Sequence, residues 1–177
     1  MKIIAFGGSS SKQSINKKLA VYAASLFKNC EVEVLDLNDY ELPLFSVDIE
    51  KEIGQPKLAK DFLDRIFSAD LLVVSMAEHN RNYSTAFKNI SDWASRIELN
   101  IFKDKPMLLM ATSTGARGGA SVLEISEKYF PRFGAKIIAT FSLPSFEENF
   151  KEGEGIVNEE LKNKLIEIIK KIQDEQL

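Results

Sequence analysis

The segment from Gly7 to Asn16 has a composition suited to binding a phosphate group. It contains two glycines and four serines, and it leads from a short apolar run directly into a helical pattern. Backbone N–H groups at a helix start attract anions, serine hydroxyls donate hydrogen bonds, and glycines let the chain approach a ligand closely. A simpler interpretation is that Ser14 only caps the helix. The segment matches neither GxxxxGK[ST] nor GxGxxG, so it does not indicate a nucleoside triphosphate or dinucleotide site.

Two further segments combine polar side chains with turn-forming residues. The first, from Ala77 to Ser84, contains His79, the only histidine of the chain. One histidine cannot form a multi-histidine metal site, and the sequence has no G-x-S-x-G elbow that would support a Ser-His-Asp hydrolase. The second segment, from Ser113 to Gly119, carries three glycines. It fits either a loop that approaches a flat ligand or a tight turn without a ligand.

These three segments follow apolar runs that alternate with helical patterns. The runs at 71–74 and 107–110 are apolar at consecutive positions, as central strands are when helices cover both faces of a parallel sheet. We therefore predict an α/β fold with a doubly wound, five-stranded parallel sheet and helices on both faces. Ligands of such sheets bind beyond the carboxyl ends of the strands, where the three segments lie. The predicted strands are Lys2 to Phe6, Glu31 to Asp36, Asp70 to Ser75, Pro106 to Thr112 and Ala135 to Leu143.

Five helical patterns are predicted between and after these strands. The last has an apolar stripe that we expect to pack on the sheet, although its charged opposite face could also suit a membrane surface. The stripe is formed by Leu161, Leu165, Ile168 and Ile172. Two stretches, Leu37 to Gln55 and Ser145 to Gly155, are predicted to be irregular, and such long loops tend to be functional or interfacial. The helices are Ile15 to Lys28, one that begins near Pro56, Ser84 to Glu98, Gly119 to Phe133 and Asn158 to Gln173.

The composition is that of an ordinary globular protein. With 177 residues, 45% of them hydrophobic, the chain fits one domain spanning residues 1–177. Its 23 basic residues are scattered among 26 acidic ones, so there is no basic stripe for nucleic acid. Cys30 is alone, which excludes a disulfide within the chain. The lone cysteine makes a cytoplasmic location the simplest expectation. No apolar run approaches the ~20 residues of a membrane span, so we expect no membrane partner. The lack of a basic stripe likewise predicts no nucleic-acid partner.

The three polar segments resemble motifs of the NADPH-dependent FMN reductase family, the flavodoxin-like group that includes quinone, azo-dye and chromate reductases. The first is similar to the family's G-S-x-R-x-x-S-x-N, the second to its P-E-Y-N-G-S-Y-P-x-x-L-K-N-A-I-D-W, and the third to its S-x-G-x-x-G-G. Each similarity is modest, but the three occur in order at strand ends, and the resemblance covers about residues 1 to 145. The matching residues of the first two motifs are Gly8, Ser9, Ser14 and Asn16, then Glu78, Asn80, Tyr83, Lys88, Asn89, Asp92 and Trp93.

The resemblance implies FMN as a bound cofactor. It assigns Ser9, Ser11, Ser14 and Asn16 to the FMN phosphate, and Ser11 stands where the family often has Arg, so Lys12 is expected to supply charge there. It assigns Glu78, His79, Asn80, Ser113, Gly115 and Gly118 to the isoalloxazine edge and ribityl chain, largely through backbone contacts. For His79, a surface loop position and a proton donor remain alternatives. We expect Trp93 to be structural.

The function that the resemblance implies is an FMN-dependent NAD(P)H oxidoreductase that moves electrons from NADPH, or NADH, to a small acceptor such as a quinone. We expect ping-pong kinetics, because one stacking face must be vacated before the second substrate binds, and we assign no catalytic side chain and no metal. Arg81 and Arg117 are predicted to bind substrate, through the 2′-phosphate of NADPH. A homodimer or homotetramer through the third and fourth predicted helices is implied. The alternative is a flavodoxin-type electron carrier that binds FMN on the same fold.

Overall fold

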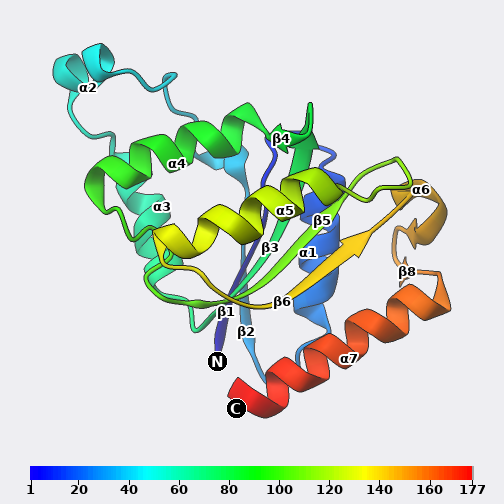
Figure 1. Ribbon diagram of the computed structural model, residues 1–177. Helices are drawn as coiled ribbons and strands as arrows, with labels where there is room; N and C mark the ends of the chain where they lie inside the picture. Colours follow the sequence, from blue (N-terminus) through cyan, green and yellow to red (C-terminus); the bar gives the residue numbers. More distant parts are fainter. Residues whose placement is uncertain (177) are drawn as a thin grey trace.

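Five parallel strands form the centre of the computed structural model, which describes residues 1–176 (Figure 1). Their spatial order is β2-β1-β3-β5-β6, and all pairings along it are parallel. This order, which reverses between β1 and β3, is the flavodoxin-like arrangement and confirms the predicted fold class. The strands are β1 (Lys2–Gly7), β2 (Glu31–Leu35), β3 (Leu71–His79), β5 (Pro106–Thr112) and β6 (Lys136–Leu143).

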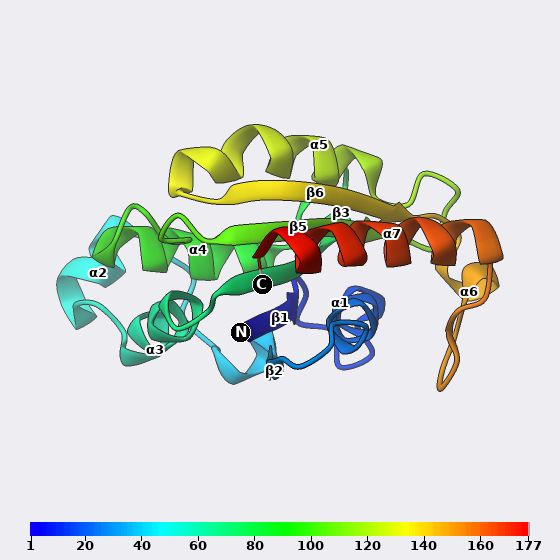
Figure 2. The same cartoon turned by 90° about the horizontal axis from the view of Figure 1, so that it is seen from below.

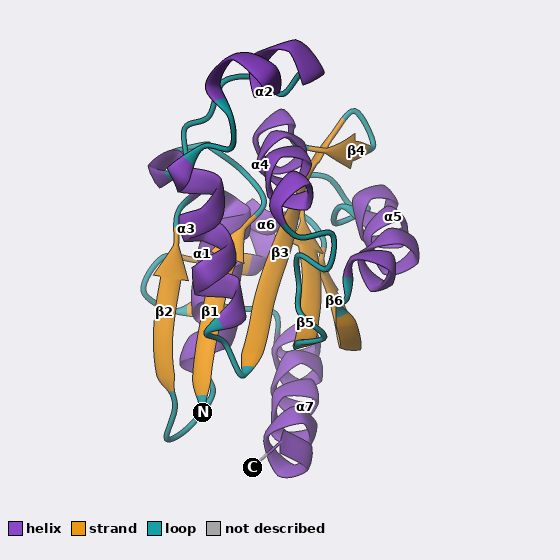
Figure 3. Cartoon of the chain, turned by 90° about the vertical axis from the view of Figure 1, so that its left-hand side faces the viewer, coloured by secondary structure: helices purple, strands orange, loops and turns teal. Residues whose placement is uncertain are grey.

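Helices cover both faces of the sheet (Figures 2 and 3). On one face, α3 (Lys57–Phe67), α4 (Thr85–Ile97) and α5 (Ala120–Tyr129) share a core with the strands. On the other face lie α1 (Ile15–Ser25) and α7 (Glu159–Gln176). Because each central strand is covered on both sides, residues 71–74 and 107–110 are completely buried. Their consecutive apolar residues thus predicted the two central strands correctly.

The C-terminal helix packs on the sheet as predicted. Leu165, Ile169 and Ile172 of α7 are buried in the same cluster as residues of α1, and Leu161 and Ile168 pack against it. None of the helices within residues 1–176 is both long enough and apolar enough to cross a membrane.

Two stretches predicted to be irregular contain short elements. The first holds a 3-10 turn at Leu37–Asp39 and helix α2 (Val47–Ile53), which stands away from the rest of the molecule in Figure 1. Helix α2 has only seven residues and none of them is buried, so its apolar residues Val47, Ile49 and Ile53 do not belong to a longer stripe that would have predicted a helix. The second stretch holds α6 (Phe146–Asn149) and a hairpin of β7 (Phe150–Lys151) and β8 (Gly155–Ile156).

Several predicted boundaries were also wrong. The first helix ends at Ser25 rather than Lys28, and two further differences lie nearer the predicted site. The fourth helix ends at Tyr129 and continues as a 3-10 turn, Phe130–Phe133, because Pro131 has no N–H to donate to a longer α-helix. β3 extends to His79 rather than Ser75 and pairs there with the antiparallel strand β4 (Asn82–Tyr83). The polar residues after the buried part of β3 therefore form a hairpin, and this hairpin carries part of the predicted site.

Candidate functional site

The loops that follow β1, β3 and β5 lie side by side at the carboxyl edge of the sheet, because these three strands are neighbours. Two hydrogen bonds of Gly8 tie the first loop to β3 and to the end of the second loop. Its N–H donates to the carbonyl of Ser75 at 2.8 Å, and its carbonyl accepts from the hydroxyl of Ser84 at 2.7 Å. The structure thus brings the three predicted segments together at one edge of the sheet.

The first loop presents several hydrogen-bond donors at the start of α1. Ser14 is the N-cap, and its hydroxyl oxygen accepts from the N–H of Lys17 at 3.1 Å, so the predicted capping role is confirmed. The hydroxyl hydrogen of Ser14 remains free to donate. The backbone amides of Lys12, Ile15 and Asn16 have no hydrogen-bond partner within residues 1–176. Unpaired amides at a helix N-terminus, with serine hydroxyls beside them, fit a phosphate group.

The other predicted phosphate residues differ in exposure. Ser9 is 8% exposed, and its hydroxyl oxygen accepts from the N–H of Ser11 at 3.1 Å, which shapes the loop. Ser11 and Lys12 are exposed, so their side chains can turn toward an anion. The loop lies very close to α1, since a Cβ atom at Gly7 would come within 2.4 Å of the amide nitrogen of Lys17.

Asn16 uses its side chain to hold the strand ends together. The residue is 3% exposed, and its Oδ1 accepts from the N–H of Thr112 at 3.0 Å and from the hydroxyl of Ser75 at 2.7 Å. Its Nδ2 donates to the carbonyl of Thr112 at 3.1 Å. The side chain therefore bridges α1, β3 and β5. This leaves the backbone N–H as the group of Asn16 that is available to a phosphate.

The second loop is a two-residue hairpin turn. Asn80 and Arg81 both have positive φ, 50° and 65°, as a type I′ turn requires. His79, Asn80 and Arg81 are exposed at its tip, and Glu78, at its base, is half-buried. A non-glycine residue in the left-handed region costs roughly 1–2 kcal/mol, so Arg81 occupies a strained position.

The third loop turns sharply from β5 into α5. Gly118 is buried with a φ of 56°, and a Cβ atom there would lie 2.3 Å from the hydroxyl of Ser142 and 2.9 Å from the nitrogen of Pro144. Contacts within the fold are therefore sufficient to require glycine at 118. At Gly115 the nearest heavy atom to a Cβ would be 4.0 Å away, so this exposed glycine faces open space beside the half-buried Ser113.

Several polar residues that organise the site were missed from the sequence. Ser75, Ser84 and Thr112 are buried and hydrogen-bonded at the strand ends or at the start of α4. A polar residue at the end of an apolar run was the available signal. Asp36, just after β2, pairs with Lys17 of α1. Burial raises the pKa of Asp36, but hydrogen bonds from Lys17 and Asn38 outweigh burial and hold the pKa below its usual value.

Trp93 is structural, as predicted. It is completely buried, its Nε1–H donates to the carbonyl of Pro43 at 2.7 Å, and its ring packs edge-on against Phe45 with centroids 5.1 Å apart. The tryptophan thus fixes the segment before α2 to α4.

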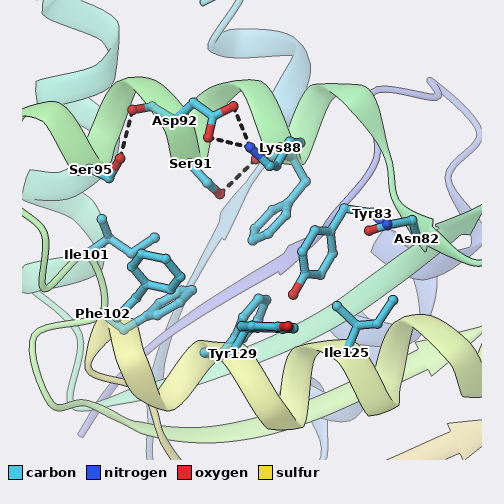
Figure 4. Close-up of a pocket in the computed structure, with 13 residues that line it drawn as sticks. Asn82, Tyr83, Lys88, Ser91, Asp92, Ser95, Ile101, Phe102, Ile125 and Tyr129 are labelled. Carbon is cyan, nitrogen blue, oxygen red and sulfur yellow. Dashed lines mark hydrogen bonds and ion pairs between the residues drawn. The ribbon is translucent and has the colours of Figure 1, made fainter.

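An aromatic pocket lies between α4 and α5, and Asn82 and Tyr83 of the second loop form one end of it (Figure 4). It has a volume of about 340 Å³. The ring of Tyr83 points into it from the hairpin, and its hydroxyl is buried without a hydrogen-bond partner within residues 1–176. Burial raises the pKa of Tyr83. The lining includes Tyr83, Phe87, Phe102, Ile125, Tyr129 and Phe130.

Comparison with known proteins identifies the family. Residues 1–148 match the family described as NADPH-dependent FMN reductase. The chain belongs to this family. An NADPH:quinone oxidoreductase of Arabidopsis thaliana is 32% identical over 125 residues, which are 68% of this chain and 62% of the relative. A 2-hydroxy-1,4-benzoquinone reductase of Burkholderia sp is 35% identical over 122 residues, 68% of this chain and 64% of the relative.

Solved structures agree with this FMN reductase fold. FerB of Paracoccus denitrificans, a flavoenzyme NAD(P)H:(acceptor) oxidoreductase, superimposes with a TM-score of 0.77 at 25% identity, covering 98% of this chain and 95% of FerB. An FMN-dependent NADH-azoreductase of Bacillus anthracis, solved with FMN, has a TM-score of 0.68 at 14% identity and shares the fold, with 98% and 100% covered. The matched segment is somewhat less than two thirds of the length of the Arabidopsis and Burkholderia relatives.

Proposed function

We propose that this FMN reductase family member is an FMN-dependent NAD(P)H oxidoreductase, acting as a single domain, that reduces a small acceptor such as a quinone by a ping-pong mechanism. The observation that carries the proposal is the set of unpaired backbone amides at the start of α1, with serine hydroxyls beside them. The two neighbouring loops resemble motifs of the family that residues 1–148 match. The quinone reductases among the relatives support the acceptor class.

The proposed roles follow from where each group lies. Ser9, Ser11, Lys12 and Ser14, with the amides of Ile15 and Asn16, would hold the phosphate at the positive end of α1. The hairpin residues Glu78 to Asn80 and the loop residues Ser113, Gly115 and Gly118 would flank the isoalloxazine ring and ribityl chain. Arg81 and Arg117, both exposed, would contact the nicotinamide substrate. FMN, when bound, would supply the redox chemistry between the reduced nicotinamide and the acceptor, so the protein needs to bind and orient rather than to exchange protons.

A flavin titration followed by steady-state kinetics tests the function. We expect saturable FMN binding at micromolar concentration, seen as a change in flavin fluorescence, and then oxidation of NADPH that depends on a quinone. Double-reciprocal plots should give parallel lines. Absence of saturable binding would remove the cofactor assignment, and intersecting lines would mean that both substrates bind together. FMN binding without any NADPH oxidation would favour the electron carrier.

We further propose that the protein forms a homodimer or homotetramer with α4 and α5 at a subunit interface, because the pocket between them is aromatic and Tyr129 at its rim is 40% exposed. The change Tyr129→Glu should weaken subunit association by at least about tenfold, since an ionised carboxylate resists burial in an apolar interface. Light scattering over a range of concentrations measures this. The matched control is Val32→Glu on edge strand β2, which is 38% exposed and should leave the oligomer unchanged. A parent protein that is monomeric at all concentrations contradicts the proposal.

A further inference from the structure

Helix α5 begins without a capping side chain of its own. Its N-cap is Gly119, which has a φ of 75° and offers no side-chain oxygen. The amide of Ala120 donates back to the carbonyl of Arg117 at 3.0 Å, so the start of the helix is continuous with the third loop of the site. The amides of the first turn otherwise need acceptors from elsewhere in the fold.

Glu78 supplies such an acceptor from another element. Its Oε2 accepts from the N–H of Val122, in the first turn of α5, at 3.0 Å. Val122 is completely buried and Glu78 is half-buried, so water competes little for this bond. A carboxylate at a helix N-terminus also lies at the positive end of the helix dipole, which stabilises its charge. Glu78 therefore caps α5 from the end of β3, 44 residues away in sequence.

This cap joins the two elements that form separate walls of the proposed flavin site, the β3–β4 hairpin and the β5–α5 loop. Glu78 pairs with Tyr83 at the base of the β3–β4 hairpin, and the hairpin tip carries His79 and Asn80. Val122 is the third residue of α5, the helix that follows the loop of Gly115 and Gly118. A single side chain thus links the base of the hairpin to the first turn of the helix that follows the loop.

We propose that Glu78 is a positioning residue, whose carboxylate caps α5 and thereby holds the hairpin and the β5–α5 loop at the separation that FMN requires. The inference rests on the proposed function, and it changes the role expected for Glu78 from contact with the isoalloxazine edge to fixation of the two walls. The carboxylate oxygen that accepts from Val122 is occupied by the helix.

Two substitutions separate positioning from direct contact with the flavin. Glu78→Gln keeps an acceptor oxygen of the same reach, whereas Glu78→Ala removes it. In the apoprotein, amide exchange of Val122 measured by NMR should accelerate about tenfold in Glu78→Ala and stay within about threefold of the parent in Glu78→Gln. The dissociation constant for FMN should follow the same order, about tenfold weaker for Ala and rescued by Gln. Glu127→Ala, which removes an exposed glutamate from the later part of α5, should change neither quantity.

Each contrary result has a distinct meaning. Unchanged Val122 exchange in Glu78→Ala would show that Glu78 does not cap the helix. Faster exchange with unchanged FMN affinity would show that the cap does not position the site. If Glu78→Gln lost FMN affinity while Val122 stayed protected, the charge would act on the flavin directly, and the positioning role would be overturned. A parent protein that binds no FMN would contradict both the proposed function and the positioning role. Amide exchange of Val122 in the apoprotein would still show whether Glu78 caps α5.

Discussion

Replacement of Ser9 by aspartate should weaken FMN binding about 100-fold, while replacement by asparagine should weaken it far less. Ser9 is 8% exposed and forms part of the loop in which the phosphate is proposed to bind. A phosphate monoester carries about two negative charges near pH 7. Two unit charges about 4 Å apart interact by about 4 kcal/mol at an effective dielectric constant of 20. Because the loop can relax and reduce this repulsion, we expect about 2.7 kcal/mol of it to remain, which corresponds to about 100-fold weaker FMN binding.

Asparagine is the matched control because it has the shape of aspartate without the charge. Its side-chain oxygen can still accept from the N–H of Ser11, as the hydroxyl of Ser9 does at 3.1 Å. The measurement is the FMN dissociation constant of the parent and both variants, with thermal unfolding of each apoprotein to confirm the fold. The difference in FMN dissociation constant between Ser9→Asp and Ser9→Asn should become smaller at high salt, because salt screens the charge repulsion. Equal losses in both variants would indicate a steric effect, and an unchanged constant in Ser9→Asp would move the phosphate away from this loop.

The sequence predicted the sheet well because each central strand is covered on both faces. Burial on both sides requires consecutive apolar residues, and 71–74 and 107–110 have them. The start of α1 was also predicted correctly, because Ser14 is a favourable N-cap residue and does cap the helix. These features depend on neighbours in sequence, so the sequence alone was sufficient to predict them.

Features that depend on distant partners were not predictable in the same way. Asn16 bonds to Thr112, 96 residues away, and Glu78 bonds to Val122, 44 residues away, so motif position alone suggested ligand contacts for both. Helix α2 was missed because its seven residues are too few to show a repeating apolar pattern, and none of them packs into the core. The site residues themselves remain predictions, although the three loops that carry them do meet at one edge of the sheet.

Removal of the Arg81 guanidinium should reduce the preference for NADPH over NADH about ten- to hundredfold. The 2′-phosphate is the only group that distinguishes the two nicotinamides, and a guanidinium offers paired donors to it. A charge-assisted hydrogen bond contributes roughly 1.5–3 kcal/mol, which sets the expected range if the bond persists in the transition state. Neither Arg81 nor Arg117 forms a salt bridge within residues 1–176, and both are exposed, so each is available to a substrate.

The strained backbone at Arg81 makes its role separable from its effect on stability. Arg81 has a φ of 65°, a conformation that glycine adopts without a steric cost. The change Arg81→Gly should therefore raise the free energy of unfolding of the apoprotein by about 0.5–1 kcal/mol. Arg81→Ala removes the guanidinium but keeps the strain, so it should lose the NADPH preference without gaining stability. The test compares kcat/KM for NADPH and NADH in the parent, both Arg81 variants and Arg117→Ala, together with urea unfolding. The alternative is that one arginine is only solvated and the other pairs with an acidic residue of a second subunit. A ratio that neither arginine changes severalfold, or a parent that prefers NADH, would exclude both arginines as the source of NADPH selectivity.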